Sequence, residues 1–244
     1  MQKMATAPVG VSGIVARALT LVEKVQGAGQ HKVDASHDSF HVLRVLATAR
    51  RLADEERRRG VAVDETVVDL AAVLHDVDDW KYRAPTDDPS LSHAQQFLEG
   101  EKEVTEEMRH AVLEVIRNMG FKEQLSSSGQ RDHAVPLRPE LAIVQDADRL
   151  DAIGAIGVAR TFTFSGAKRP GTPLYDPSCP PRTTMTKEEY VSNPNGSAIN
   201  HFHEKLLKLK DMMNTETGKR MAEKRHAFML QFLDQFNDEW NGDS

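Results

Sequence analysis

Three apolar helical segments of this chain carry His or Asp side chains where the pattern calls for apolar residues. The segments cover residues 37–45, 74–79 and 146–151. The second follows the apolar run 67–74, and the third follows the apolar run 141–144. An unpaired ionisable group is expensive to bury, and one divalent cation can compensate several such groups together. The pattern therefore predicts a fold in which the three segments close around a metal ion.

Helical periodicity dominates the rest of the chain. Apolar residues recur at intervals of three and four positions, as in an amphipathic helix, and sustained β alternation is lacking. Helices are predicted near 11–25, 41–60, 64–74, 92–100, 105–119 and 138–162. Asp64 or Thr66 would cap the third helix. Gly154 and Gly157 within the last one indicate close approach of another helix or of a ligand. We expect an all-α helical bundle.

The domain organisation is predicted to be simple. Residues 1–244 would form one domain with a core at about 30–164, and C-terminal helices over 198–240 would pack back on it. Between them, residues 165–197 are rich in Pro and Gly. A long irregular segment in a compact domain tends to be functional or mobile. We expect it to cover the metal cleft as a lid, with Arg182 among its contacts to phosphate.

Charge and cysteine content narrow the class of protein. The 31 basic and 37 acidic residues give a net charge of −6, so no excess positive field attracts nucleic acid. No apolar stretch approaches the ~20 residues of a membrane span. The single cysteine, Cys179, has no partner for a disulfide, which favours the cytoplasm. The oligomeric state stays open, a homodimer included.

The predicted metal ligands combine imidazole and carboxylate groups. His75 and Asp76 are neighbours, project about 100° apart on a helix, and can both reach an ion at its end. The full predicted set is His41, His75, Asp76 and Asp148. Such ligands suit Mn²⁺, Fe²⁺, Co²⁺, Ni²⁺ or Zn²⁺. We expect one ion, with Mn²⁺ first and Mg²⁺ also open. Further histidines that leave a second ion open are His93, His110 and His133.

Other polar residues near these ligands suit phosphate chemistry. Asp79, four positions after His75, would share its helical face and act as the proton acceptor. Arg44, Lys81 and Lys122 would neutralise phosphate oxygens. Asp146 is the substitute if the third segment is misassigned by a short step.

These motifs resemble those of the HD-domain metal-dependent phosphohydrolases. The stretch 41–45 is similar to the H-x-x-R-V entry motif, His75-Asp76 to the doublet that names the family, and Asp148 in Ala-Asp-Arg-Leu to the last metal aspartate. The last motif resembles that of (p)ppGpp hydrolase domains. In those enzymes the carboxylate four residues after the doublet histidine is catalytic, which implies this role for Asp79.

Segments 36–38, 146–154 and 201–207 resemble the YpgQ/YedJ-type branch of that family, and the likeness runs from about residue 30 to the C-terminus. This resemblance implies an HD-type bundle that hydrolyses nucleoside triphosphates and releases pyrophosphate. It also favours His201 as a residue that reaches the site. His37, Asp38 and Asp151 lie about one helical turn from a predicted ligand. With Lys122 and His201, they form the predicted set of substrate contacts.

The sequence therefore predicts a metal-dependent phosphohydrolase acting on a small nucleotide, most specifically a nucleoside triphosphate pyrophosphohydrolase. A 5′-nucleotidase and an alarmone hydrolase share the same inner ligands and remain alternatives. A different class, a non-catalytic module that senses a metal ion or a nucleotide, would retain the pocket without the reaction.

Overall fold

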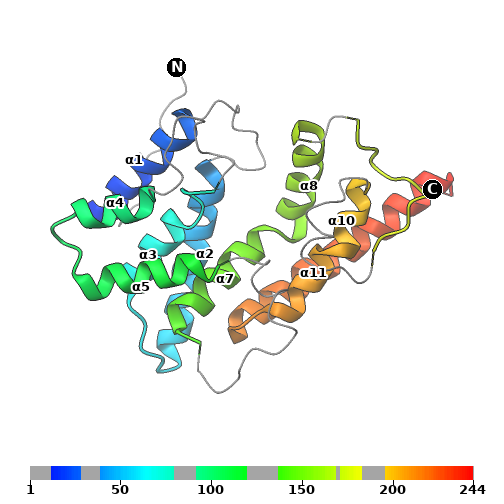
Figure 1. Ribbon diagram of the computed structural model, residues 1–244. Helices are drawn as coiled ribbons and strands as arrows, with labels where there is room; N and C mark the ends of the chain where they lie inside the picture. The colour runs from blue at the N-terminus through cyan, green and yellow to red at the C-terminus, as the bar shows by residue number, and fades with distance from the viewer. Residues whose placement is uncertain are drawn as a thin grey trace.

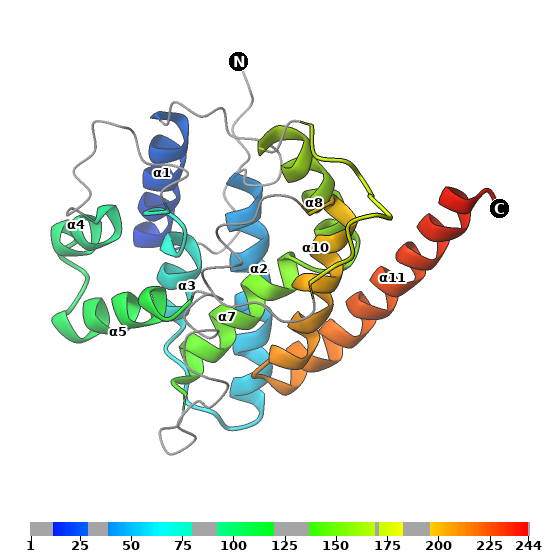
Figure 2. The ribbon, with the colours of Figure 1, turned by 45° about the vertical axis from the view of Figure 1, so that its right-hand side comes forward.

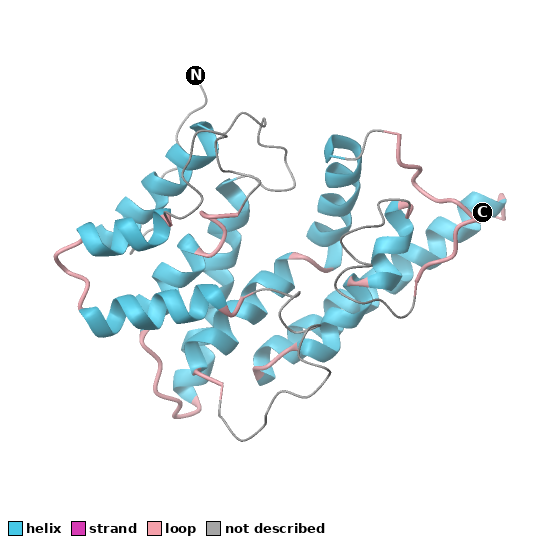
Figure 3. Cartoon of the chain, in the orientation of Figure 1, coloured by secondary structure: helices cyan, strands magenta, loops and turns pink. Residues whose placement is uncertain are grey.

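The described part of the chain is built of helices joined by loops. The computed structural model describes residues 12–28, 39–79, 92–119, 137–168, 171–182 and 196–243, and it contains no strand within these ranges (Figure 3). No helix in them is both long and apolar enough to cross a membrane. The all-α prediction is confirmed.

Helix α3 (Glu65–Leu74) lies at the centre of the first half. Asp64 caps it by accepting hydrogen bonds from the backbone N–H groups of Thr66 and Val67. Asp64 was one of the two caps predicted for this helix. Seven of its residues are buried, because α1 (Gly13–Ala28), α2 (Ser39–Arg58), α5 (Glu106–Arg117) and α7 (Pro139–Asp151) all pack against it. The apolar residues of α3 are buried because neighbouring helices cover most of its circumference.

Helices α2 and α7 pack on α3 and on each other, so three helices meet in the region that carries the predicted metal ligands (Figure 1). The apolar face of α2 that makes these contacts consists of Val42, Val45, Leu46, Ala49 and Leu52, all of them buried. Helix α4 (His93–Gly100) packs on α5 at the edge of this half.

The second half contains α8 (Gly154–Lys168), α10 (Ala198–Glu204), the 3₁₀ helix η1 (Leu206–Met212) and α11 (Glu216–Asn241). Helix α11 packs on α8, η1, α7 and α2, so the C-terminal helices do pack back on the first half. Its last turns extend beyond the other helices (Figure 2). The rings of Phe162, Phe202 and Phe232 join these helices, with centroids 5.8–6.1 Å apart.

The single helix predicted over 138–162 is wrong, because the chain turns between α7 and α8. Gly154 has a φ of +75°, a conformation that glycine adopts without strain. A Cβ atom at this position would lie 2.9 Å from Cγ of Arg225 on α11. The Arg225 guanidinium donates a hydrogen bond to the carbonyl of Leu150. Close approach of another helix therefore explains this glycine, as predicted, but it also ends α7.

The described part of the predicted lid is anchored to α10 and α11. Residues 165–168 belong to α8, and 171–182 are irregular. The guanidinium of Arg182 donates to both carboxylate oxygens of Glu204 at 2.9 and 3.0 Å, and the ring of Tyr175 packs edge-on against Trp240 at 5.1 Å. Arg182 was expected to contact phosphate and instead ties this stretch to α10. Residues 183–195 lie outside the described ranges.

A buried carboxylate on α7 holds the start of α11. The side chain of Asp146 is fully buried. It accepts hydrogen bonds from the backbone N–H groups of Asn214 and Thr215, at 2.9 and 2.7 Å, and from the Thr215 hydroxyl at 2.8 Å. An anion is favoured at a helix N-terminus, where backbone N–H groups lack partners. Asp146, the substitute metal ligand suggested by the sequence, is thus committed to α11.

Candidate metal centre

The four predicted metal ligands come together where α2, the end of α3 and α7 meet. The Nε2 atom of His41 lies 3.7 Å from Oδ2 of Asp76 and 3.6 Å from Oδ1 of Asp148. The Nε2 atom of His75 lies 3.5 and 3.8 Å from the same two oxygens. Each imidazole therefore faces both carboxylates.

These distances fit a site for one divalent cation. Ligand atoms of His41, His75 and Asp148 all lie within 4.8 Å of one another, and two ligands bound to one ion at roughly 2.0–2.3 Å lie about 3–4 Å apart. The Nε2 atom of His75 is buried and has no hydrogen-bond partner among the described residues. Buried polar atoms nearly always have a partner. A metal ion would provide the missing partner of this nitrogen.

The electrostatics of the cluster favour a cation. Burial lowers the pKa of His75, but the negative charges of Asp76 and Asp148 outweigh this effect and raise that pKa above its ordinary value. The two carboxylates thus stabilise positive charge on the imidazole. The same field would stabilise a divalent ion between them.

Both imidazoles are oriented through their Nδ1 atoms. Nδ1 of His75 lies 2.9 Å from the carbonyl oxygen of Ala72, and Nδ1 of His41 lies 2.7 Å from Oδ2 of Asp151. The rings meet edge-on, with an interplanar angle of 71°. With Nδ1 as the donor, each Nε2 retains a lone pair for the ion.

Asp151, predicted to contact substrate, lies beneath the cluster and binds three side chains. Its carboxylate accepts hydrogen bonds from His41, from Nε of Arg44 at 2.7 Å and from the Arg160 guanidinium at 2.9 Å. Burial raises the pKa of Asp151, but the bonds from His41 and Arg44 outweigh burial and hold the pKa well below its usual range. Asp151 is therefore an anion that supports His41.

Arg160 is the residue of this cluster that sequence reasoning missed. It lies nine residues after Asp151, on α8, and reaches the carboxylate only because the chain turns at Gly154. A continuous helix would not have brought the two residues together, since nine residues are two and a half turns. Once a break at Gly154 is assumed, the remaining signal is that Arg160 is the only charged residue of α8 before its last residue, Lys168.

The residues predicted for catalysis are only partly described. Arg44 forms a two-bond ion pair with Asp151, and its side chain is 33% exposed. Asp79 is half-buried and donates its backbone N–H to the carbonyl of Asp76 at 3.0 Å. Helix α3 ends at Leu74, so the expected shared helical face of His75 and Asp79 is wrong, although the turn keeps Asp79 beside Asp76. Lys81 lies outside the described residues.

Of the predicted substrate contacts, only Asp151 and His201 lie within the described residues. His37, Asp38 and Lys122 lie outside the described residues. His201 is half-buried on α10, which packs against α8 and η1. The structure therefore brings the predicted metal ligands together, whereas the role of the other residues in substrate binding stays a prediction.

Two of the three histidines that left a second ion open, His93 and His110, are described, and neither lies in the metal cluster. Nδ1 of His93 lies 3.0 Å from Oδ1 of Asp78, and hydrogen bonds from Ser92 and from His93 outweigh the effect of burial and lower the pKa of Asp78. The side chain of His110 is 71% exposed. His133 lies outside the described residues. One ion remains our expectation.

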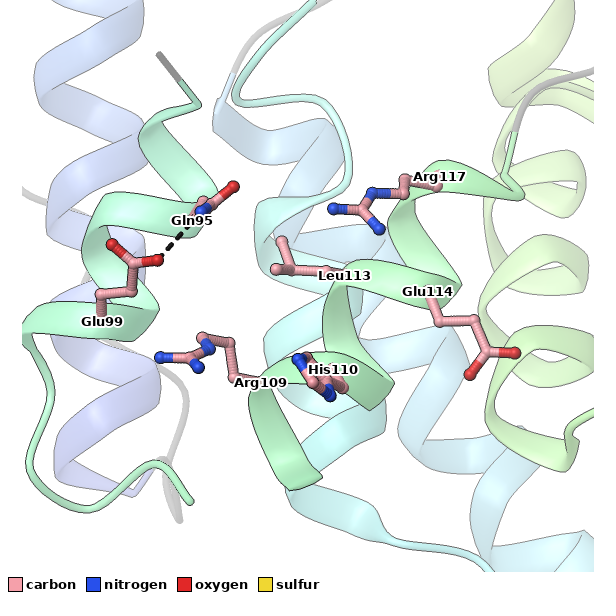
Figure 4. A pocket seen from close by; sticks show the side chains of 7 residues that line it. All are labelled: Gln95, Glu99, Arg109, His110, Leu113, Glu114 and Arg117. Atoms are coloured by element: carbon pink, nitrogen blue, oxygen red, sulfur yellow. Dashed lines mark hydrogen bonds between the residues drawn. The ribbon is translucent and has the colours of Figure 1, made fainter. Parts of the chain in front are cut away.

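A surface pocket of about 440 Å³ lies elsewhere, between α4 and α5 (Figure 4). Figure 4 shows Arg109 pointing from α5 toward α4, which carries Gln95 and Glu99. The pocket is lined by opposite charges and contains none of the four predicted ligands. We place the functional site at the metal cluster, because the cluster holds a buried nitrogen for which the described residues offer no partner, whereas the pocket is an open groove between two helices.

Comparison with known proteins agrees with this location. A family model described as HD domain matches residues 39–153, a range that includes all four predicted ligands. YpgQ of Bacillus subtilis is 37% identical over 212 residues, which cover 85% of this chain and 86% of that protein.

Solved structures give the same assignment. A crystal structure from Lactobacillus plantarum superposes with a TM-score of 0.74 at 36% identity, covering 96% of this chain and 100% of that one. An HD-superfamily hydrolase from Bacillus thuringiensis gives 0.64 at 37% identity, covering 93% and 96%. YpgQ was crystallised in complex with ADP, and that structure gives 0.62 at 34% identity, covering 93% and 100%.

Proposed function

The chain belongs to the HD-domain family, and on this premise we propose that it is a metal-dependent phosphohydrolase that cleaves nucleoside triphosphates to the monophosphate and pyrophosphate. The nucleotide part of the proposal is supported by the complex of the relative YpgQ with ADP. The metal part is supported by the cluster of His41, His75, Asp76 and Asp148. We propose Mn²⁺ as the ion, one of several divalent ions that mixed imidazole and carboxylate ligands suit.

The observation that carries the proposal is the Nε2 atom of His75. It is buried, lacks a hydrogen-bond partner within the described part of the chain, and faces two carboxylates at 3.5 and 3.8 Å. A structural ion pair would instead form a hydrogen bond at about 2.8 Å. The spacing of a ligand atom that shares an ion with its neighbours is about 3–4 Å.

In the proposed reaction, a water oxygen forms a bond to the α-phosphorus while the bond from that phosphorus to the bridging oxygen breaks, and pyrophosphate leaves. A bound divalent ion supplies charge screening and a more acidic water. Asp79 accepts the proton that the attacking water loses. Arg44 and Lys81 stabilise the negative charge on the phosphate oxygens.

Product analysis tests the proposal. Purified protein is incubated with nucleoside triphosphates, a 5′-monophosphate and (p)ppGpp, each with Mn²⁺, Mg²⁺ or Co²⁺, and the phosphate products are separated. We expect monophosphate and pyrophosphate from triphosphates, and no activity after chelation. The variant Asp148→Asn should lose the metal ion and the activity.

Asp69→Asn is the matched control. Asp69 on α3 is also a carboxylate paired with an arginine of α2, Arg50, at 2.6 and 2.9 Å, but it lies outside the cluster. This variant should keep full activity per folded molecule. Orthophosphate from the monophosphate would instead indicate a 5′-nucleotidase, and 3′-pyrophosphate release from (p)ppGpp an alarmone hydrolase. Metal and nucleotide binding without any product would indicate a sensing module.

A further inference from the structure

Asp151 connects three helices at one carboxylate. It is the last residue of α7, and its side chain is 5% exposed. His41 and Arg44 reach it from α2, and Arg160 reaches it from α8. Its distance from Nδ1 of His41, 2.7 Å, is that of a strong hydrogen bond to a charged acceptor.

The two ring nitrogens of His41 face different groups. Nδ1 faces Asp151, whereas Nε2 faces Asp76 at 3.7 Å and Asp148 at 3.6 Å. A neutral imidazole carries one proton and one lone pair. An ionised carboxylate accepts hydrogen bonds and donates none, so a neutral His41 that donates to Asp151 carries its proton on Nδ1 and directs the lone pair of Nε2 toward the cluster.

Arg44 and Arg160 hold the carboxylate of Asp151 in place, and this carboxylate contacts His41. Arg44 donates from Nε to Oδ1 and from its terminal nitrogen to Oδ2, at 2.7 and 3.0 Å, and Arg160 donates to Oδ2 at 2.9 Å. A two-bond guanidinium–carboxylate pair has a defined plane. Asp151 therefore has little freedom to rotate away from His41.

We propose that Asp151 is a positioning residue, which sets the tautomer and orientation of His41 for the metal ion, and that Arg160 holds it in place from α8. This inference rests on the proposed function, since it assumes that His41 binds an ion. It assigns Asp151 a role beneath the metal ion instead of at the substrate. It also makes α8, which supplies none of the predicted ligands, a determinant of metal affinity.

The chain contains a matched ion pair without a histidine. Arg50 of α2 and Asp69 of α3 form the same two-bond arrangement, at 2.9 and 2.6 Å, and both are partly buried. If Asp151 served only to join helices, neutralising either aspartate would reduce stability and leave metal binding alone. A positioning role predicts that only Asp151 affects the ion.

The first measurement uses the wild-type protein without metal. Nitrogen-15 NMR of the histidine rings at a pH of about 9, well above the ordinary histidine pKa of about 6.5, identifies which ring nitrogen carries the proton. We expect His41 to be protonated on Nδ1. A proton on Nε2 would overturn the proposal without any variant.

The second measurement is Mn²⁺ affinity by calorimetry, without nucleotide. Loss of a partner behind a ligating histidine typically weakens metal binding 10–100-fold, so Asp151→Asn should weaken it by about that factor. Asp69→Asn should match the wild type. Equal affinity in both variants would overturn the proposal.

Arg160→Gln covers the case in which Asp151→Asn does not fold. It leaves Asp151 and His41 in place, and Mn²⁺ affinity should fall, but by less than the roughly 10–100-fold expected for the loss of Asp151. Unchanged affinity would remove α8 from the proposal. A wild-type protein that binds no divalent ion would refute the proposed function itself, whereas a wild type and Asp151→Asn that bind Mn²⁺ equally would refute only the inference.

Discussion

Replacing Gly218 with alanine should destabilise the protein, although alanine is the better helix former by about 1 kcal/mol. Gly218 lies in the first turn of α11. A Cβ atom there would lie 2.4 Å from Oδ2 of Asp146 and 2.7 Å from Oγ1 of Thr215. Both atoms are constrained, because Asp146 is fully buried and the Thr215 hydroxyl caps α11.

The magnitude follows from the bonds that must yield. Oδ2 of Asp146 accepts hydrogen bonds from the backbone N–H and the hydroxyl of Thr215, at 2.7 and 2.8 Å. Hydrogen bonds to a charged group contribute about 1.5–3 kcal/mol each. The gain in helix propensity offsets a part, and Asp146 retains bonds from Asn214 to Oδ1. We expect a net loss of about 2–4 kcal/mol, or roughly 5–15 °C in Tm.

Urea unfolding followed by circular dichroism measures this loss as a lower midpoint at unchanged slope. Gly166→Ala is the control, because Gly166 also lies in a helix, α8, and a Cβ atom there would meet nothing within 4 Å. It should be neutral or more stable by up to about 1 kcal/mol. If Gly218→Ala were as stable as Gly166→Ala, the contact between Asp146 and α11 would not constrain this position.

Two further predictions concern the site and the irregular stretch. Asp79→Asn keeps the volume of the side chain and removes the proton acceptor, so activity should fall roughly 10²–10⁴-fold while the bound metal, measured by mass spectrometry, is retained; loss of the metal would make Asp79 a ligand instead. Burial raises the pKa of Glu204, but its hydrogen bonds from Arg182 outweigh burial and lower that pKa. The stabilisation by ionised Glu204 is therefore complete above its ordinary pKa of about 4.3 and is lost as the pH falls through the lower folded-state value. At pH 7 the free energy of unfolding of the wild type should be about 1–2 kcal/mol higher than that of Glu204→Gln. Urea unfolding at lower pH should show this difference vanish in acid. A difference that stays constant with pH would contradict the ion pair.

Local patterns were enough to predict helix α3. The cap at Asp64 and the apolar run that follows it define α3 without reference to other helices. A metal site could be proposed from sequence because ionisable groups within apolar helices require compensation, and the resemblance to HD-domain motifs selected His41, His75, Asp76 and Asp148 as its ligands. Helix periodicity does not tell which of Asp146 and Asp148 faces which neighbour, and here the structure was needed: Asp146 binds the start of α11.

What the sequence did not predict depends on residues far apart along the chain. The turn after α7 packs against Arg225, which lies 71 positions after Gly154. The position of Arg160 follows from that turn. The pairing of Arg182 with Glu204 joins residues 22 positions apart across undescribed chain. No periodicity in a single sequence encodes such contacts, since each depends on how two helices already pack.

Helix α7 faces two separate tasks, and this limits the changes that it can tolerate. Asp146 binds the N-terminus of α11, while Asp148, two residues and about 200° further around the helix, faces the imidazoles. One residue inserted or deleted upstream within α7 would rotate both carboxylates by about 100° relative to the preceding turns. The metal site and the contact between α7 and α11 would then be lost together. Insertions and deletions should therefore be tolerated in the loops of this chain but not in α7. In a library of single-residue insertions, the variants with an insertion within residues 139–151 should fail to fold.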